Sequence, residues 1–339
     1  MRSIIRKLFL IVVFFAELAF ASNEASAYFI YDYGKIFEIE HKSQNINLNA
    51  KILYQSPVSF NWNSTDIKND GGKIVLFSAS FPFNIDSFIL EPSFLFGNGN
   101  WQKGDFQYFY GKPDLPYVLG FSMYFYHYSN TLGANYIFGN AKLLNNRENA
   151  ELFDSDFYIY DVFYKFNINK DFNFYTGFAR LNIEAIGALT AENQGYFLFP
   201  YAFYEASGYL DAKAIYGFAN FKLRTEMAEY GFDLGALAII GGKITGDMHY
   251  KYRKFFGTEE IIESLKPVQM GNNSFIFSIF SIKSKKIKIG KNYIQYGIQK
   301  PLAIPFGKLF YESQNIGNSD NIVKNAFFWG LTASVNFYF

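Results

Sequence analysis

The chain has 339 residues, a formal net charge of +1 and no cysteine. The missing cysteines exclude a disulfide framework and a thiolate metal site, and the near-neutral charge gives no support for a nucleic-acid partner. Aromatic residues make up 21% of the sequence, yet the mean hydropathy is -0.03. This balance of aromatic and polar residues is typical of strands that present one face to lipid and the other to water.

The start of the chain predicts a secretory signal peptide. Three basic residues precede an apolar run over 8–15, and the small-residue motif Ala19-Phe20-Ala21 follows it. We expect cleavage after Ala21, with Ala25-Ser26-Ala27 as the alternative site. The predicted organisation is therefore a signal peptide over 1–21 and a single barrel domain over 22–339. No later segment approaches the roughly 20 consecutive apolar residues of a membrane helix.

Apolar and polar residues alternate with a period of two along the mature chain, which predicts an all-β protein. On a strand over 46–54, one face carries Ile46, Leu48, Ala50, Ile52 and Tyr54. On a strand over 156–168, one face carries Tyr158, Tyr160, Val162, Tyr164, Phe166 and Ile168. The segment from Asn169 to Asp171 predicts a tight hairpin, whereas longer polar segments separate other strands. Tight turns at one rim and long loops at the other are typical of bacterial outer-membrane barrels.

The end of the sequence is a second signal for such a barrel. Apolar Leu331, Ala333, Val335, Phe337 and Phe339 alternate with more polar residues. This ending resembles the closing strand of outer-membrane β-barrels, whose terminal aromatic residue is read by the barrel assembly machinery. The resemblance implies that machinery as a partner. We predict a transmembrane antiparallel β-barrel of about 14 strands, within a range of roughly 12 to 16, in the bacterial outer membrane.

Counting strands back from Phe339, which should lie in the periplasm, predicts the direction of each strand. The turns on the periplasmic side of this count are Asn169 to Asp171, Ser207-Gly208, Gly241-Gly242 and Ser284-Lys285. Residues 130–155 become an extracellular loop, so a strand over 117–129 would run outward and end near the outer leaflet. A strand over 133–144 would reverse that direction, and this alternative stays open.

The strand over 117–129 leads into the motif His127-Tyr128-Ser129-Asn130. Its predicted lipid-facing side carries Leu119, Phe121, Met123 and Phe125, and strict alternation adds His127 and Ser129 to that side. Ester hydrolysis by serine needs a base, a group that orients the base, and a donor to the oxyanion. We therefore assign His127 as a candidate base, Ser129 as a candidate nucleophile and Asn130 as a candidate oxyanion donor.

The orienting group must come from a neighbouring strand or a loop. Asp156 is the leading candidate because it lies on the same outward face as Tyr158 and Tyr160, at the predicted top of the next strand. The competing candidates are Asp154, Glu148, Glu151, Asn140 and Asn135.

The sequence His127-Tyr128-Ser129-Asn130 resembles the local motif of two outer-membrane families, the lipid A 3-O-deacylases and the outer-membrane phospholipases A. Both are barrels with an outward-facing His-x-Ser pair, often followed by Asn, so the resemblance implies an acyl-ester hydrolase acting on lipid A or phospholipid. The families' third residue follows about a dozen residues later, which here falls on Ala141 beside Asn140. No calcium-binding loop is recognisable, and we expect neither a metal nor another cofactor.

Other histidines are weaker candidates. His249 lies in an alternating strand with basic residues on one face, which suits a stripe for lipid phosphate or a solvated barrel rim. His41 lies in a turn-like segment and receives no role. A histidine beside Tyr126 and Tyr128 is also ordinary in an interfacial aromatic belt.

Two functions therefore follow from the sequence. The first is a lipid acyl hydrolase, and the alternative is a non-enzymatic porin, hydrophobic-solute channel or structural outer-membrane protein. The inward face predicted for the strand over 156–168 carries Phe157, Ile159, Asp161, Phe163, Lys165 and Asn167. This mixed set does not indicate a wide polar pore.

Overall fold

A computed structural model describes most of the predicted barrel domain. The described residues are 46–55, 58–62, 65–69, 72–101, 104–106, 109–145, 151–191, 202–254, 257–264, 268–269, 273–307 and 328–339. The predicted signal peptide lies outside these ranges, as does His41. Within the described ranges the regular elements are strands, and no helix has the length and apolar character needed to cross a membrane.

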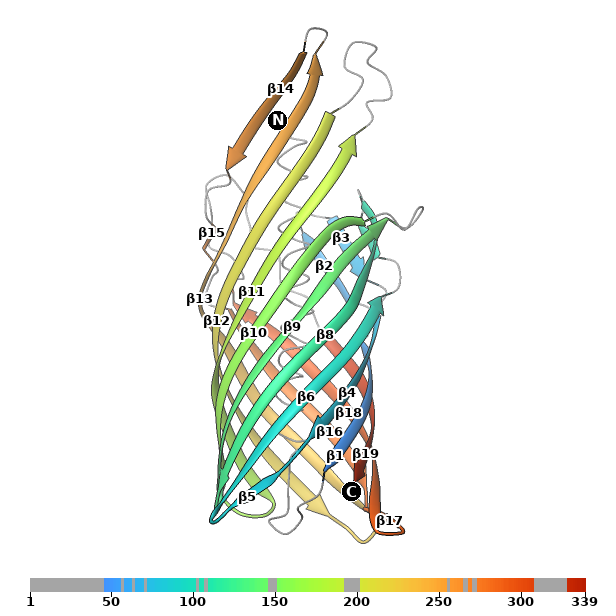
Figure 1. Cartoon of the computed structure of the whole chain (residues 1–339), viewed down its shortest axis with the longest axis vertical. Coiled ribbons are helices and arrows are strands. Elements are labelled where there is room, and N and C mark those ends of the chain that lie inside the picture. Colours follow the sequence, from blue (N-terminus) through green and yellow to red (C-terminus); the bar gives the residue numbers. More distant parts are fainter. Residues whose placement is uncertain are drawn as a thin grey trace.

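Twelve strands pair edge to edge in a closed antiparallel barrel (Figure 1). In order around the barrel they are β1 (Asn47–Gln55), β4 (Gly72–Ser80), β6 (Phe88–Trp101), β8 (Phe109–His127), β9 (Asn130–Asn145), β10 (Glu151–Asn167), β11 (Phe172–Ala191), β12 (Ala202–Arg224), β13 (Ala228–Lys254), β16 (Asn273–Ser284), β18 (Asn292–Gly307) and β19 (Phe328–Tyr338). The barrel closes where β1 pairs with β19, with Asn47 opposite Tyr338. The predicted fold class is confirmed, and the count lies at the low end of the predicted range.

The two ends of the barrel differ in their connections. The end that we call the turn rim has short turns at 81–87, 128–129, 168–171, 225–227 and 285–291, with β5 (Phe83–Ile85) and β17 (Ile287–Ile289) in two of them. The opposite end, the loop rim, carries the short strands β2 (Val58–Trp62), β3 (Thr65–Asn69), β7 (Gly104–Phe106), β14 (Gly257–Ser264) and β15 (Val268–Gln269). The C-terminus lies at the turn rim and β14 at the far opposite end (Figure 1). Because short turns face the periplasm in bacterial barrels, the loop rim is the extracellular end.

The outward face of the barrel is a band of exposed apolar side chains. It includes Phe94 and Phe96 of β6, Phe121 and Met123 of β8, Val162 of β10, Phe280 of β16 and Leu331 of β19. The alternation predicted for 46–54, 156–168 and the C-terminal strand is confirmed, since the apolar set of each strand points outward. A continuous apolar band of this kind is stable against lipid and unfavourable in water. The chain is a bacterial outer-membrane β-barrel protein.

Two predicted turns lie inside strands, and this explains the lower strand count. Ser207-Gly208 lies within β12 and Gly241-Gly242 within β13, and these strands pair from Arg224 opposite Glu229 to Ala202 opposite Tyr252. The register shifts once, between Lys213 and Ala214. Gly241 lies at this bulge, whereas Ser207-Gly208 pairs regularly with Gly246 and Asp247. Glycine at a bulge resembles a turn signal in sequence. β13 has 27 residues, far more than the roughly 9 to 11 that cross a bilayer.

The predicted direction of the strand over 117–129 was wrong. Residues 130–145 form β9, which pairs with β8, so the alternative with a strand over 133–144 is the correct one. Tyr128 and Ser129 form a two-residue turn, in which Tyr128 adopts a left-handed backbone with φ of 52°. Such positions favour Gly or Asn, and neither occupies this one. The motif therefore lies at the turn rim, away from the outer leaflet.

This orientation predicts which side of the membrane labels each rim. The chain contains no cysteine, so a single Tyr128→Cys substitution introduces one reactive thiol at a side chain that is 72% exposed. We expect a membrane-impermeant maleimide to leave it unlabelled on intact cells and to label it after the outer membrane is permeabilised. Asp156→Cys, at an exposed side chain of β10 toward the loop rim, is the control and should react on intact cells. Labelling of Tyr128→Cys on intact cells would contradict the assigned orientation.

Candidate functional site

The structure places His127 on the outward face at the end of β8, as predicted. Its ring is half-buried, with ring centroids 4.8 Å from Phe88 and 4.3 Å from Tyr128. The carbonyl of Ser129 accepts hydrogen bonds from the backbone N (2.9 Å) and the Nδ2 (3.0 Å) of Asn167. These contacts hold the turn against the end of β10. They are contacts of a packed turn at the periplasmic rim.

The remaining predicted residues do not gather around this pair. The Asn130 Oδ1 accepts a hydrogen bond from the Tyr164 hydroxyl (2.7 Å). Asp156 is exposed on the outward face of β10, opposite Asn140 in register, whereas Asn130 lies opposite Phe166. Ten residues of strand separate the two levels, or about 33 Å. The structure therefore does not bring Asp156 to His127 and Ser129.

The competing candidates do not replace Asp156. Asp154 and Asn140 lie at the same distant level as Asp156, Glu151 begins β10 beyond them, Asn135 points into the barrel, and Glu148 lies outside the described residues. Asn140 Nδ2 donates to Asp156 Oδ1 (3.0 Å) and to Asp154 Oδ1, and Lys142 pairs with Asp154 at 3.6 Å. These groups form a cluster of their own toward the loop rim. Among the described residues, no group of three His, Cys, Asp or Glu side chains is arranged to hold a metal ion.

The side chains that point into the barrel form two layers. The layer nearer the turn rim, here the polar belt, includes Ser80 (β4), Glu91 and Ser93 (β6), Ser122 and Tyr124 (β8), Asn135 (β9), Asp161 (β10), Asn173 (β11), Tyr216 and Asn220 (β12) and Asp233 (β13). The layer nearer the loop rim, here the apolar belt, includes Leu95 (β6), Val118 (β8), Ile137 (β9), Ile159 (β10), Leu181 and Ile183 (β11), Leu210 (β12) and Leu237 (β13). All of these side chains are buried.

The change from polar to apolar takes two residues on β6, β9 and β10 and four on β8 and β13. On β9 it falls between Asn135 and Ile137, and on β10 between Asp161 and Ile159. In the ladder, Ile137 is opposite Ile159 and Ile159 is opposite Leu181, so the apolar belt continues from strand to strand. On these strands the inward face is therefore apolar toward the loop rim and polar toward the turn rim. On β1, β18 and β19 the buried inward side chains include the polar Lys51, Gln299 and Thr332.

A hydrogen-bonded chain spans the polar belt from β8 to β12. The Tyr124 hydroxyl donates to Asn135 Oδ1 (2.8 Å), and Asn135 Nδ2 donates to Asp161 Oδ2 (2.6 Å). The Tyr216 hydroxyl donates to Asp161 Oδ1 (2.7 Å). Both carboxylate oxygens of the buried Asp161 are thus satisfied, which offsets the cost of burying that group. A fully partnered network of this kind makes the wall rigid.

Glycines allow the aromatic members of this chain to cross neighbouring strands. A Cβ at Gly177 of β11 would overlap the ring and hydroxyl of Tyr216, which passes over β11 to reach Asp161. A Cβ at Gly133 of β9 would overlap the ring of Phe163 and approach that of Tyr124. The rings of Phe163 and Tyr124 have centroids 5.7 Å apart. Inward glycines beside large rings are therefore part of the lumen wall.

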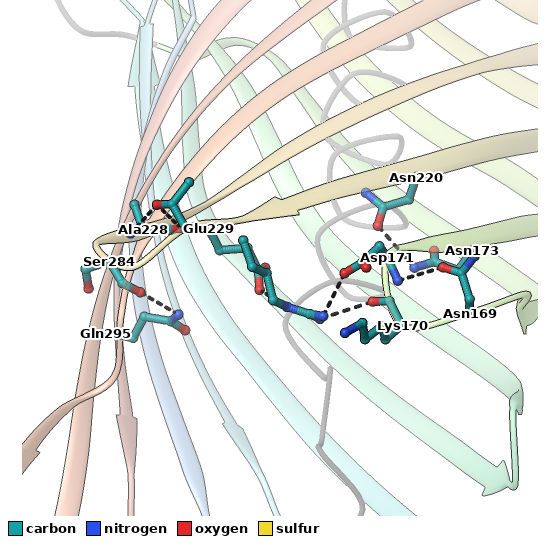
Figure 2. A network of polar contacts seen from close by, with 11 residues as sticks. Asn169, Lys170, Asp171, Asn173, Asn220, Ala228, Glu229, Ser284 and Gln295 are labelled. Carbon is teal, nitrogen blue, oxygen red and sulfur yellow. Dashed lines mark hydrogen bonds and ion pairs between the residues drawn. The ribbon is translucent and has the colours of Figure 1, made fainter.

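A second network of polar contacts lies at the turn rim and joins two of its turns (Figure 2). Arg224, at the end of β12, bonds Asp171 Oδ1 through Nη1 (2.8 Å), the Lys170 carbonyl through Nη2 (3.1 Å) and Glu229 Oε2 through Nε (3.1 Å). Asn169 Oδ1 accepts from the backbone N of Asp171 and caps the predicted hairpin, which is confirmed. These contacts tie the turn at 168–171 to the turn at 225–227. In this exposed position their stabilising effect is small, and their role is to hold the rim in register.

The sequence predicted the inward face of β10 but assigned it no function. Phe157, Ile159, Asp161, Phe163 and Lys165 are buried and point inward, as expected. The sequence feature that could have indicated a site is an acid between Ile159 and Phe163 on the face opposite to lipid. The partners of Asp161 come from other strands, so no local motif contains them.

The chain is similar to known proteins in its barrel fold. No protein-family model matches the chain, and no curated protein resembles it in sequence. The chain is similar to the β-domain of the Bordetella autotransporter BrkA, with a TM-score of 0.48 and 7% identity over 87% of this chain and 100% of that one. It is also similar to an outer-membrane channel from Pseudomonas putida F1 (TM-score 0.46, 12% identity, 89% of this chain, 98% of that one).

A third similarity is to the toluene transporter TbuX of Ralstonia pickettii (TM-score 0.44, 7% identity, 88% of this chain, 90% of that one). Similarities at this level assign no substrate.

Gly177→Ala tests the crossing of Tyr216 over β11. The added methyl group has to displace the Tyr216 ring from Asp161, so we expect a loss of about 1 to 3 kcal/mol in the free energy of unfolding. Urea unfolding of the barrel in lipid vesicles measures this loss. Gly241→Ala is the matched control, because a Cβ there meets nothing within 4 Å. Equal losses in the two variants would contradict the packing argument.

Ser129→Ala and His127→Ala test the hydrolase hypothesis directly. Because the structure leaves this pair without the predicted acid, we expect both variants to leave lipid A acylation and phospholipid release unchanged from wild type. Mass spectrometry of lipid A from cells that express each form measures the acyl pattern. An acyl chain that is lost with wild type and retained with Ser129→Ala would restore the enzyme reading.

Proposed function

We propose that the chain is a non-enzymatic outer-membrane channel for small hydrophobic solutes. The observation that supports this best is the apolar belt on the lumen wall. It lies in the half of the barrel nearer the loop rim. Because its side chains are buried, we propose that a solute passes by displacing them and then contacts apolar atoms. A lumen of a general porin is polar throughout and filled with water.

The energetics of the apolar belt favour a hydrophobic solute over a hydrated one. An aromatic ring that buries roughly 200 Å² of apolar surface gains about 5 kcal/mol as an upper estimate. A sugar at the same position loses hydrogen bonds to water, and aliphatic side chains such as Ile137, Ile159 and Leu181 offer no replacement. The wall therefore selects for apolar surface.

The polar belt makes the half of the channel nearer the turn rim polar. Part of this belt, the chain from Tyr124 to Tyr216, is joined by hydrogen bonds across strands. We propose that this layer slows hydrated solutes, because their passage requires partnered groups to exchange bonds with water. We further propose that outer-membrane lipid surrounds the outward band and that the barrel assembly machinery inserts the chain.

A hydrolase role for His127 and Ser129 has less support. Both residues lie at the turn rim, and the nearest predicted acid, Asp156, lies about 33 Å along the strands. A lumen with two distinct layers is instead a feature that a transport function uses directly.

Uptake of radiolabelled toluene by cells with an intact lipopolysaccharide layer tests the proposal. We expect wild type to raise the rate of toluene entry over cells without the protein, while arabinose entry stays low. Ile159→Ser should reduce toluene entry about fivefold, because the shorter, polar side chain loses roughly 1 kcal/mol of apolar contact with the solute. Ile159→Val is the matched control and should retain most of the activity.

Folding of each variant is checked by its heat-modifiable mobility in gels. Equal toluene entry with and without the wild-type protein would overturn the proposal. Rapid arabinose entry would favour a general porin instead.

A further inference from the structure

We propose that the lumen wall of β4, β6 and β8 contains a binding site for a small monovalent cation. The site consists of the Glu91 carboxylate and the hydroxyls of Ser80, Ser93 and Ser122. It does not depend on the proposed transport of hydrophobic solutes.

The sheet register brings these four side chains together. Ser80 of β4 is opposite Ser93 of β6, and Ser93 is opposite Ser122 of β8. Directly opposed residues have Cβ atoms about 4.5 to 5.5 Å apart. Glu91 is two residues from Ser93 on the same face of β6, which is roughly 7 Å along the strand. Three hydroxyls in a row and one carboxylate therefore share a small area of the inner wall.

These groups are buried without hydrogen-bond partners. Glu91 is 0% exposed, and Ser80 and Ser93 are each 1% exposed. Both Glu91 carboxylate oxygens lack a hydrogen bond, as do the hydroxyl oxygens of Ser80, Ser93 and Ser122. The hydroxyls of Ser80 and Tyr126 lie close to Glu91 but do not reach hydrogen-bond geometry with it. Five buried oxygen atoms without hydrogen bonds lie in one small area of the wall. A positively charged ligand, which binds oxygen lone pairs, would satisfy them.

The contrast with Asp161 shows that this arrangement is specific. Asp161 occupies the same belt at similar burial, and both of its oxygens accept hydrogen bonds from protein donors. Among the residues that the structure describes, the two buried lysines, Lys51 and Lys165, do not fill this role for Glu91. Lys51 lies level with Gly97, six residues along β6 from Glu91 and about 20 Å away. The Lys165 Nζ lies over the Tyr175 ring, 5.1 Å from its centroid.

The charge and the donor atoms indicate a monovalent cation. One carboxylate neutralises one positive charge, whereas a divalent ion would leave a net charge in a buried site. Carboxylate and hydroxyl oxygens are hard ligands that suit alkali cations, and the same oxygens accept hydrogen bonds from an ammonium group. Na⁺, K⁺ and the ammonium end of an organic solute share this chemistry.

Thermal unfolding of the detergent-solubilised full barrel tests the site without any transport assay. Ligands that bind only the folded state raise the unfolding midpoint in a saturable way. Wild type is compared in the chlorides of Na⁺, K⁺, methylammonium and N-methyl-D-glucamine at equal ionic strength. We expect a higher midpoint in at least one of the first three salts than in the bulky N-methyl-D-glucamine. A rise in Na⁺ or K⁺ identifies an inorganic ion as the ligand, and a rise in methylammonium alone identifies an ammonium group. Equal midpoints in all four salts would overturn the proposal.

Glu91→Gln separates a ligand site from a structural carboxylate. We expect this variant to lose the cation-dependent rise and to unfold at a higher temperature than wild type in N-methyl-D-glucamine, because it removes an uncompensated buried charge. Asp156→Asn, which changes an exposed outward carboxylate, should keep the rise. A cation-dependent rise that is unchanged in Glu91→Gln would overturn the proposal.

Ser93→Ala tests the site through a smaller change, should Glu91→Gln fail to fold. Loss of one hydroxyl ligand should raise the apparent Kd for the cation about fivefold, as expected for a single hydrogen-bond-strength contact. An apparent Kd equal to that of wild type in both Ser93→Ala and Ser122→Ala would overturn the proposed ligand set.

Discussion

Closure of the sheet governs how every other part of this barrel is arranged. In the hydrocarbon of a bilayer each unpaired backbone N–H or C=O costs several kcal/mol, so an open sheet edge is not stable there. The pairing of β1 with β19 removes both edges. Once the sheet is closed, alternate side chains must face either lipid or the lumen. The outward band and the two inner belts are consequences of that geometry.

On the inner wall, large aromatic side chains pack over positions where the neighbouring strand carries glycine. Tyr216 reaches Asp161 across β11 only because Gly177 has no side chain. Tyr124 and Phe163 use Gly133 in the same way. The rings lie against the wall and connect strands that are not neighbours in the sheet. These contacts between strands that are not adjacent make the inner wall rigid.

Two buried acids in the polar belt show how one environment supports two roles. Asp161 is held by donors from β9 and β12 and acts as a structural node. Glu91 faces three serines whose hydroxyls, like its own oxygens, lack partners. The first arrangement is complete within the protein, and the second is complete only with a ligand. Burial alone did not separate them, since both are almost fully inaccessible.

The fold class could be predicted from the sequence, and so could the lipid-facing side chains of the strands over 46–54, 156–168 and the C-terminus, because an alternation with a period of two involves only neighbouring residues. The sequence also located the hairpin at Asn169 to Asp171. It did not determine the strand count, because glycines at a bulge in β13 have the same local pattern as a turn, nor the direction of β8, because Tyr128 occupies a turn position that usually carries Gly or Asn. Only the tertiary structure separated His127 from Asp156 and assembled the inner belts. Their members meet through register between strands, and register depends on the closure of the whole barrel.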